Sequence, residues 1–266
     1  MYETTYHRPA TVDDAVALFK KGSDAKFLAG GQTLLPVMKQ RLAAPSDVID
    51  LARIPALVGV SATADALVIK GATTYYDIMT SADAKKAIPA IVHLTSVLGD
   101  PAVRYRGTIG GSIANNDPAA DYPAAVVALD ATVKTNKRSI KAEDFFKGLF
   151  STALEDGEII TEVSFPIPAK AAYAKMRHPA SRFALTGVFV AKTKSGEVRV
   201  AATGASQDGV MRVPAIEAAL KANWSAGALD SVKISADGLM EDLHGTAAYR
   251  ANLIKVMAQR AVADAG

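Results

Sequence analysis

Two pairs of adjacent glycines are the residues of this sequence best suited to binding chemistry. The first pair lies in "FLAGGQTLLPVMKQ", residues 27–40, and the second in "RGTIGGSIANNDPAAD", residues 106–121. Glycine has no Cβ, so its backbone N–H groups can approach a phosphate oxygen closely. Either pair alone is more typical of a turn, but two pairs followed by small polar residues favour a diphosphate ligand. From the chemistry alone, both interpretations stay open.

Hydroxyl and amide side chains beside the glycines supply further hydrogen-bond donors for such a ligand. They are Gln32, Thr33, Thr108, Ser112 and Asn115. Neither segment contains GxGxxG, and neither carries the lysine of a Walker loop. The pattern therefore argues against a Rossmann-type nucleotide site and against a P-loop.

Metal-ion and acid–base chemistry have little support in the sequence. The four histidines, His7, His93, His178 and His244, are scattered without metal-ligand spacing. Asp117 and Asp121 are separated by Pro118, which favours one ligand contact and one turn or cap residue over a catalytic pair. We predict no protein-ligated metal and no catalytic residue. The absence of cysteine excludes disulfides, a thiolate nucleophile and a cysteine-ligated iron–sulfur cluster, so redox chemistry would need a bound group.

Length and composition limit the class of protein. The chain has 266 residues, half of them hydrophobic, and a formal net charge of +3, which suits one or two globular domains. The basic residues are interspersed with acidic ones, so we expect no nucleic-acid partner. No apolar stretch approaches the roughly 20 residues that span a bilayer, and "MYETTYHRPA" lacks a signal-peptide layout. We therefore expect no integral membrane segment and a cytoplasmic location.

The helices and strands that the sequence pattern predicts around the glycine pairs indicate an α+β fold. Thr11 is the predicted N-cap of a helix that ends at Gly22. Strands follow in "KFLAGG" and "DVIDL", with a helix in "LPVMKQRL" between them, which closes a β-α-β-β-like unit at about residue 55. The second unit begins with a hairpin around "TADA" and continues with helices in "TYYDIMTSADAKKA", "AIVHLTSVLG" and "PAAVVAL". It then has strands in "ATVKTN" and "EIITEVSFP".

A domain boundary is expected near Pro168, where two prolines close a strand. Residues 1–168 would form one domain with subdomains of about 1–55 and 56–168, and residues 169–266 a smaller α+β domain. In that smaller domain we predict an antiparallel hairpin around Ser195-Gly196 and a helix beginning at the proline of "VPAIEAAL". Thr246 is the predicted cap of the last helix.

Three of these segments, "FLAGGQTLLPVMKQRL", "DPAVRYRGTIGGSIANNDPAADYPAAVVALDA" and "EIITEVSFP", together resemble one family. It is the FAD-binding medium subunit of molybdenum hydroxylases, the group of aerobic carbon monoxide dehydrogenase and xanthine dehydrogenase. "HGTAAYRANLIKVMAQRAV" is similar to the C-terminal domain of the same flavoproteins. The resemblance covers nearly the whole chain in order, and it implies the two-subdomain FAD-binding fold of the vanillyl-alcohol oxidase (PCMH) type.

The resemblance also implies a set of cofactor-binding residues. The first FAD diphosphate loop corresponds to Ala29, Gly30, Gly31, Gln32 and Thr33, and the second to Thr108, Ile109, Gly110, Gly111 and Ser112. Asp121 matches a contact on the adenosine side of FAD, and Leu98, Ile160 and Lys175 match further contacts. Phe183 stands where some relatives place a tyrosine over the isoalloxazine ring, so it either stacks on the flavin or packs under the C-terminal sheet.

The function implied is that of an electron exit port. Substrate would be oxidised at a molybdenum cofactor in a large partner subunit, and a small [2Fe–2S] subunit would pass electrons to this FAD. The acceptor would be a quinone, NAD or oxygen, and the complex a dimer of heterotrimers. Two alternatives stay open: a stand-alone FAD oxidase or reductase of the same fold, and a non-enzymatic diphosphate-binding protein. The first would need its own acid–base residue, for which the sequence offers no candidate.

Overall fold

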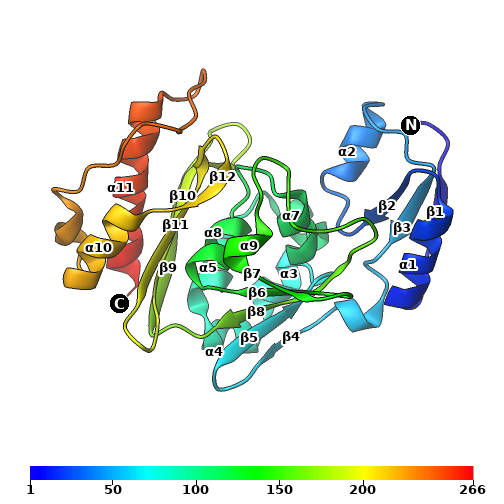
Figure 1. Ribbon diagram of the computed structural model, residues 1–266, viewed down its shortest axis with the longest axis horizontal. Coiled ribbons are helices and arrows are strands. Elements are labelled where there is room, and N and C mark those ends of the chain that lie inside the picture. Colours follow the sequence, from blue (N-terminus) through cyan, green and yellow to red (C-terminus); the bar gives the residue numbers. More distant parts are fainter. Residues whose placement is uncertain (266) are drawn as a thin grey trace.

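A small parallel sheet begins the chain in the computed structural model, which describes residues 1–265 (Figure 1). Its elements are β1 Thr5–His7, α1 Val12–Lys21, β2 Ala25–Leu28, α2 Leu34–Lys39 and β3 Asp47–Asp50. The strand order is β1-β3-β2, and all pairs are parallel. Thr11 caps α1 by accepting from the Asp14 N–H at 3.1 Å, and α1 ends at Gly22, as predicted. The strand β1 was not predicted, because three residues carry too little periodic pattern.

A five-stranded antiparallel sheet follows, in the order β4-β5-β8-β6-β7. Its strands are β4 Val60–Ala62, β5 Ala66–Lys70, β6 Thr132–Thr135, β7 Ser139–Lys141 and β8 Ile160–Pro166. Its helices are η1 Pro55–Leu57, α3 Tyr75–Thr80, α4 Ala82–Ala87, α5 Pro89–Ser96, α6 Pro101–Arg106, α7 Ile109–Asn115, α8 Tyr122–Ala128 and α9 Ala142–Phe145. The prediction of a single helix in "TYYDIMTSADAKKA" is wrong, because this segment contains two helices, α3 and α4. Ser81 ends α3 and caps α4 by accepting from the Ala84 N–H at 3.2 Å, and the chain turns there.

The C-terminal part contains a four-stranded antiparallel sheet, in the order β12-β11-β10-β9. Its elements are β9 Lys170–Arg177, β10 Ala184–Lys192, β11 Val198–Ser206, β12 Gly209–Arg212, α10 Pro214–Ala222, η2 Ala226–Leu229 and α11 Ala247–Asp264. The predicted hairpin turns at Gly196, which has φ +91°, and Thr246 caps α11 by accepting from the Tyr249 N–H. Neither α11 nor any other helix within residues 1–265 is long and apolar enough to cross a membrane.

The C-terminal sheet lies between two layers of helices (Figure 1). Helices α10 and α11 cover one face, and α5 and α8 pack on the other. Hydrogen bonds also join this sheet to the middle unit, the part of the chain that contains the five-stranded sheet. The Thr203 hydroxyl lies 2.9 Å from the Pro118 carbonyl oxygen and 2.7 Å from that of Ala120. This packing fixes the segment before α8 against the C-terminal sheet, and that segment forms part of the cleft described next.

Candidate functional site

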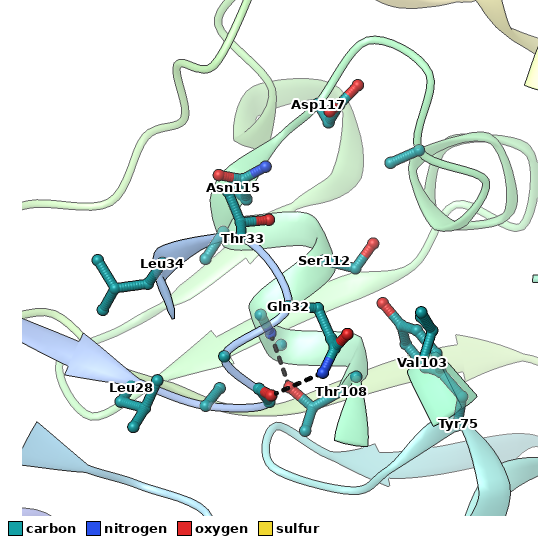
Figure 2. Close-up of a pocket in the computed structure, with 18 of the residues that line it drawn as sticks. Leu28, Gln32, Thr33, Leu34, Tyr75, Val103, Thr108, Ser112, Asn115 and Asp117 are labelled. Atoms are coloured by element: carbon teal, nitrogen blue, oxygen red, sulfur yellow. Dashed lines mark hydrogen bonds between the residues drawn. The ribbon is translucent and has the colours of Figure 1, made fainter. Parts of the chain in front are cut away.

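A cleft of about 1060 Å³ lies where the three parts of the chain meet. Its walls come from the β2–α2 loop, the segment from Leu98 to Asp121, residues 158–160 and the β9–β10 turn. Figure 2 shows Gln32, Thr33, Thr108 and Ser112 around this space. Pockets for small molecules measure about 300 to 1,000 Å³, so this one has room for a dinucleotide.

The first glycine loop presents unused backbone donors to the cleft. Within residues 1–265, none of the N–H groups from Gly30 to Leu34 has a protein acceptor. Gly31 has φ +72°, which turns the chain so that successive N–H groups line a concave surface. Thr33 precedes α2 but makes no side-chain cap bond, and both Gln32 and Thr33 are exposed. The loop therefore offers a set of N–H groups that an anionic group can satisfy.

The second glycine loop is built differently, which corrects the expectation that both loops present several N–H groups. The N–H groups of Ile109, Gly110, Gly111 and Ser112 donate to Thr73 O, Gly71 O, Thr108 Oγ1 and Thr108 O, respectively, at 2.9 to 3.3 Å. In this loop only the N–H of Thr108 has no protein acceptor within the described residues. The second loop can therefore contribute the Ser112 and Thr108 hydroxyls, but few backbone donors.

Close backbone packing explains two of the glycines without any ligand. A Cβ on Gly30 would lie 2.1 Å from the Arg106 carbonyl oxygen, and one on Gly110 would lie 2.4 Å from that of Gly71. A Cβ on Gly71 would in turn lie 2.1 Å from the Ile160 carbonyl oxygen. Backbone atoms cannot move aside as a flexible side chain can, so these positions accept only glycine. Gly71 is a cleft residue that the sequence analysis missed, because its neighbour Ile160 lies far away in the chain.

Asp121 and Lys175 meet beneath the cleft as a buried ion pair. The Asp121 Oδ1 lies 2.8 Å from the Lys175 Nζ and accepts the Tyr173 hydroxyl at 2.5 Å. Burial raises the pKa of the Asp121 carboxyl, and Lys175 opposes that rise. Asp121 also lines the cleft, whereas Lys175 does not. Contact of either residue with a cofactor stays a prediction, and their contact with each other joins the α8 segment to β9.

The remaining predicted site residues divide into those that line the cleft and one that does not. Leu98, Ile160 and Phe183 line the cleft together with Ala29, Gly31 and Gly111. Phe183 is 49 % exposed, so it does not pack under the C-terminal sheet. Ile109 is fully buried in the core of the middle unit and does not line the cleft. Its backbone fixes the start of α7, while its side chain faces away from the site.

Two cleft residues with shifted pKa values were not predicted. Burial raises the pKa of Tyr75 to about 12, although the nearby Ser112 hydroxyl opposes the rise. Burial disfavours the charge of Glu158, but hydrogen bonds from Arg138, the Glu155 N–H and Thr135 outweigh this effect and lower its pKa to about 2. Tyr75 therefore stays neutral and Glu158 stays charged near neutral pH. Tyr75 follows no glycine pair and belongs to no motif. Glu158 begins the segment "EIITEVSFP", but nothing in that segment marked its side chain as a cleft residue.

The structure also shows where Asp117 and the histidines lie. Asp117 is a turn residue, since its Oδ1 accepts the Ala119 N–H at 2.8 Å. No cluster of three or more potential metal-ligating side chains occurs among residues 1–265. However, the description of the histidines as scattered is wrong for one pair. His178 and His244 lie 3.1 Å apart between Nε2 and Nδ1, close to the β9–β10 turn.

Comparison with known proteins gives a consistent set of relatives. Residues 2–168 match the family described as the FAD binding domain in molybdopterin dehydrogenase. The chain is 34 % identical to the carbon monoxide dehydrogenase medium chain of Hydrogenophaga pseudoflava, covering 97 % of this chain and 95 % of that one. It is 33 % identical to the nicotine 6-hydroxylase medium subunit of Paenarthrobacter nicotinovorans, covering 98 % and 96 %.

The fold of the whole chain has a counterpart among solved structures. Reconstituted CO dehydrogenase from Oligotropha carboxidovorans contains a chain that superimposes with a TM-score of 0.89 at 32 % sequence identity. The superposition covers 99 % of this chain and 97 % of that one. The likeness therefore includes the C-terminal sheet and helices as well as the part matched by the family.

Proposed function

Because the chain belongs to the family of FAD-binding domains in molybdopterin dehydrogenases, we propose that it is the FAD-carrying subunit of a molybdenum hydroxylase complex. In that role it passes electrons from [2Fe–2S] clusters of a small partner subunit to an external acceptor, which is a quinone, NAD or oxygen. A large partner subunit holds the molybdenum cofactor, and the complex is a cytoplasmic dimer of heterotrimers. The single observation that carries the proposal is the cleft with unused N–H groups from Gly30 to Leu34.

The cleft fits FAD by size and by the chemistry of its donors. The N–H groups of the first loop and the hydroxyls of Thr108 and Ser112 would hold the diphosphate. Gly30 lets the first loop approach the Arg106–Gly107 backbone, and Gly110 lets the second loop pack on the Gly71 backbone. Leu98 and Ile160 would add apolar contacts, while the Asp121–Lys175 pair supports the adenosine side. Phe183 would stack on the isoalloxazine ring from the β9–β10 turn.

The division of labour between the subunits explains what this chain lacks. When bound, the flavin supplies the exchange of electrons one or two at a time, which suits a junction between clusters and a two-electron acceptor. The chain itself has no cysteine for a cluster. Its own task is to bind the cofactor, orient the ring and leave one edge accessible. We also propose that residues 1–168 are the cofactor domain and residues 169–266 a second domain that supplies the β9–β10 turn.

A stand-alone FAD oxidase or reductase is the rival function. It would need an acid–base side chain in the cleft that is free to exchange a proton. The carboxylates there are engaged. Glu158 is paired with Arg138 and Asp121 with Lys175, while Asp117 accepts the Ala119 N–H and Asp100 accepts the Val103 N–H. These contacts favour the electron-transfer role over the rival.

Purification from the native source, with any accompanying subunits, tests the proposal. We expect three kinds of chain and a flavin that bleaches when the substrate of the complex is added. Bleaching is expected to disappear when the [2Fe–2S] clusters are removed, and to be absent from the isolated chain. Flavin reduction by a hydroxylase substrate in a preparation that contains only this polypeptide would instead support the stand-alone enzyme.

A further inference from the structure

The β9–β10 turn, residues 178–183, forms one rim of the cleft and is held in an unusual conformation. Ala180, Ser181, Arg182 and Phe183 all line the cleft. The His178 N–H donates to the Phe183 carbonyl at 2.8 Å, and the Arg182 N–H donates to the His178 carbonyl at 2.9 Å. Arg182 has φ +62°, a region that non-glycine residues adopt only when their surroundings hold them there. The turn therefore depends on side chains that hold it.

The imidazole of His178 supplies that support. Its Nδ1 lies 3.2 Å from the backbone N of Ala180 and of Ser181, and it accepts from both N–H groups. Nδ1 can accept only when it carries no proton, so the ring proton is on Nε2. Nε2 lies 3.1 Å from the Nδ1 of His244, which accepts in turn. The two rings meet edge to face at 89°, with centroids 4.2 Å apart. Both imidazoles are therefore neutral in this arrangement.

His244 is anchored to the C-terminal helix layer. Asp242 accepts the backbone N–H groups of His244 and Gly245 through its Oδ1, at 2.9 and 3.1 Å. The Oδ2 of Asp242 accepts from Arg250 at 2.7 Å, and Arg250 is buried on α11. Arg250 also donates to the Leu185 and Gly204 carbonyls. The pair of histidines thus joins a turn over the cleft to a fixed part of the C-terminal domain.

We propose that His178 and His244 form a proton-sensitive latch that holds the 178–183 turn over the cleft. A proton added to Nδ1 of His178 displaces the two N–H groups that it accepts. A proton added to Nδ1 of His244 meets the Nε2–H of His178. That contact is relieved if the two rings separate, which removes the anchor of the turn, or if the His178 proton moves to Nδ1, which again displaces the turn. Protonation of either ring therefore weakens the hold on the turn.

The charges around the pair do not offset this effect. Arg177 and Arg182 flank His178 in its own segment, and Arg250 lies behind His244 on α11. The carboxylate of Asp242 is already used by Arg250 and two backbone N–H groups. Within residues 1–265, neither ring of the pair forms a salt bridge with a carboxylate. Acidification would therefore open the latch. This proposal does not depend on which cofactor fills the cleft.

Backbone amide exchange measured by NMR between pH 8 and pH 5 tests the latch. After correction for intrinsic exchange rates, we expect protection of the Ala180 and Ser181 amides to fall at least about threefold on acidification, as for loss of a hydrogen bond. The Gly196 amide in the β10–β11 turn is the internal control. It donates to the Thr193 carbonyl at 3.0 Å in a turn without histidine, and its protection should not change.

Three variants separate the latch from a merely structural role. His178→Asn keeps an acceptor near the position of Nδ1 but does not titrate, so its protection should be the same at both pH values. His178→Ala should lose protection at both, and His244→Ala should lose protection at pH 8 because the anchor is gone. Equal protection of the wild-type amides at pH 8 and pH 5 would overturn the proposal. So would a pH dependence in His178→Asn that matches the wild type.

Discussion

The two glycine loops of this protein have the same dipeptide and face the same cleft, yet they do different work. From Gly30 to Leu34 the first loop leaves its N–H groups without protein acceptors. From Ile109 to Ser112 the second loop uses every N–H within the chain. The first loop is thus open to a ligand, and the second is closed by internal hydrogen bonds. A glycine pair can mark the ligand-binding backbone or the packing that supports it, and sequence alone does not tell the two apart.

The closed side of the cleft extends beyond the second loop. Gly110 packs on Gly71, and Gly71 packs on Ile160. Glu158, which also lines the cleft, accepts hydrogen bonds from Arg138, Thr135 and the Glu155 N–H. These groups make a rigid wall against which the open loop can hold an anion. Substitutions on the closed side should therefore affect folding, and those at the exposed positions of the open loop, Gln32 and Thr33, should affect binding.

The largest effect is expected for Gly110→Val. Its Cβ would lie 2.4 Å from the Gly71 carbonyl oxygen, and neither backbone can yield. We expect a loss of about 3 kcal/mol or more in the free energy of unfolding, measured by denaturant titration. Gly196→Val is the control, because a Cβ there meets no atom within 4 Å, although its positive φ carries some strain. Equal losses in the two variants would contradict close packing at Gly110.

The second-largest effect is expected from acidification, which should lower the free energy of unfolding by protonating Glu158 on the closed side. The Glu158 pKa is lowered to about 2 in the folded chain from an ordinary value of 4.5. Its contribution to stability is therefore complete above about pH 4.5 and is lost as the pH falls toward about 2. We expect Glu158→Gln to cost about 2 kcal/mol at pH 7, less than a fully buried pair because Arg138 is partly exposed. The difference from wild type should shrink between pH 5 and pH 2.

The control for this prediction is Glu155→Gln. Its side chain is 57 % exposed, so removing its ion pairs with Lys137 and Arg138 should cost less than about 0.5 kcal/mol. A wild-type advantage over Glu158→Gln that stays constant from pH 5 to pH 2 would show that the carboxylate is not held in its charged form.

On the open side, Thr33→Asp should change binding and not folding. Thr33 is exposed, so the variant should keep its stability within about 0.5 kcal/mol. A carboxylate among the free N–H groups would repel a diphosphate, and we expect FAD affinity to fall about tenfold or more. Thr33→Asn, which adds no charge, is the matched control for titration with FAD. If Asp and Asn at this position bind FAD equally well, the diphosphate does not lie against the first loop.

The smallest effect compares the two threonines that precede α2 and α7. Thr108 accepts the Gly111 N–H at 3.1 Å, whereas Thr33 makes no such cap bond. Thr108→Val should cost about 1 kcal/mol and lower the Tm by about 2 to 4 °C. Thr33→Val should leave the Tm unchanged, and Thr108→Ser should restore most of the loss. A similar Tm for both valine variants would remove the distinction between the loops.

Local features of this fold could be predicted from the sequence, because their causes lie within a few residues. Thr11 and Thr246 cap their helices through the N–H three residues later, and Gly196 supplies the positive φ of a hairpin turn. Ser81 was missed for a related reason. Its cap bond ends one helix and begins another inside a stretch whose apolar pattern looks continuous. Propensity and periodicity do not show which of two competing local bonds will form.

Long-range features could not be predicted in the same way. The parallel order β1-β3-β2 depends on pairing between strands about forty residues apart. The sequence shows Gly110 but not the Gly71 carbonyl against it, and it shows His178 but not His244 beside it. Thirteen of the fifteen residues implied by the family resemblance line the cleft. The resemblance could not show that Ile109 faces the core or that Lys175 is paired with Asp121.

The central claim is that the open loop holds the diphosphate of one FAD in this cleft. Binding of FAD and of riboflavin, which lacks the diphosphate, to the flavin-free protein with any accompanying subunits tests it most directly. We predict one FAD per chain, riboflavin binding at least about a hundredfold weaker, and a Thr33→Asp substitution that weakens FAD binding but leaves riboflavin binding unchanged. Equal affinity for FAD and riboflavin, or no FAD binding at all, would contradict the account.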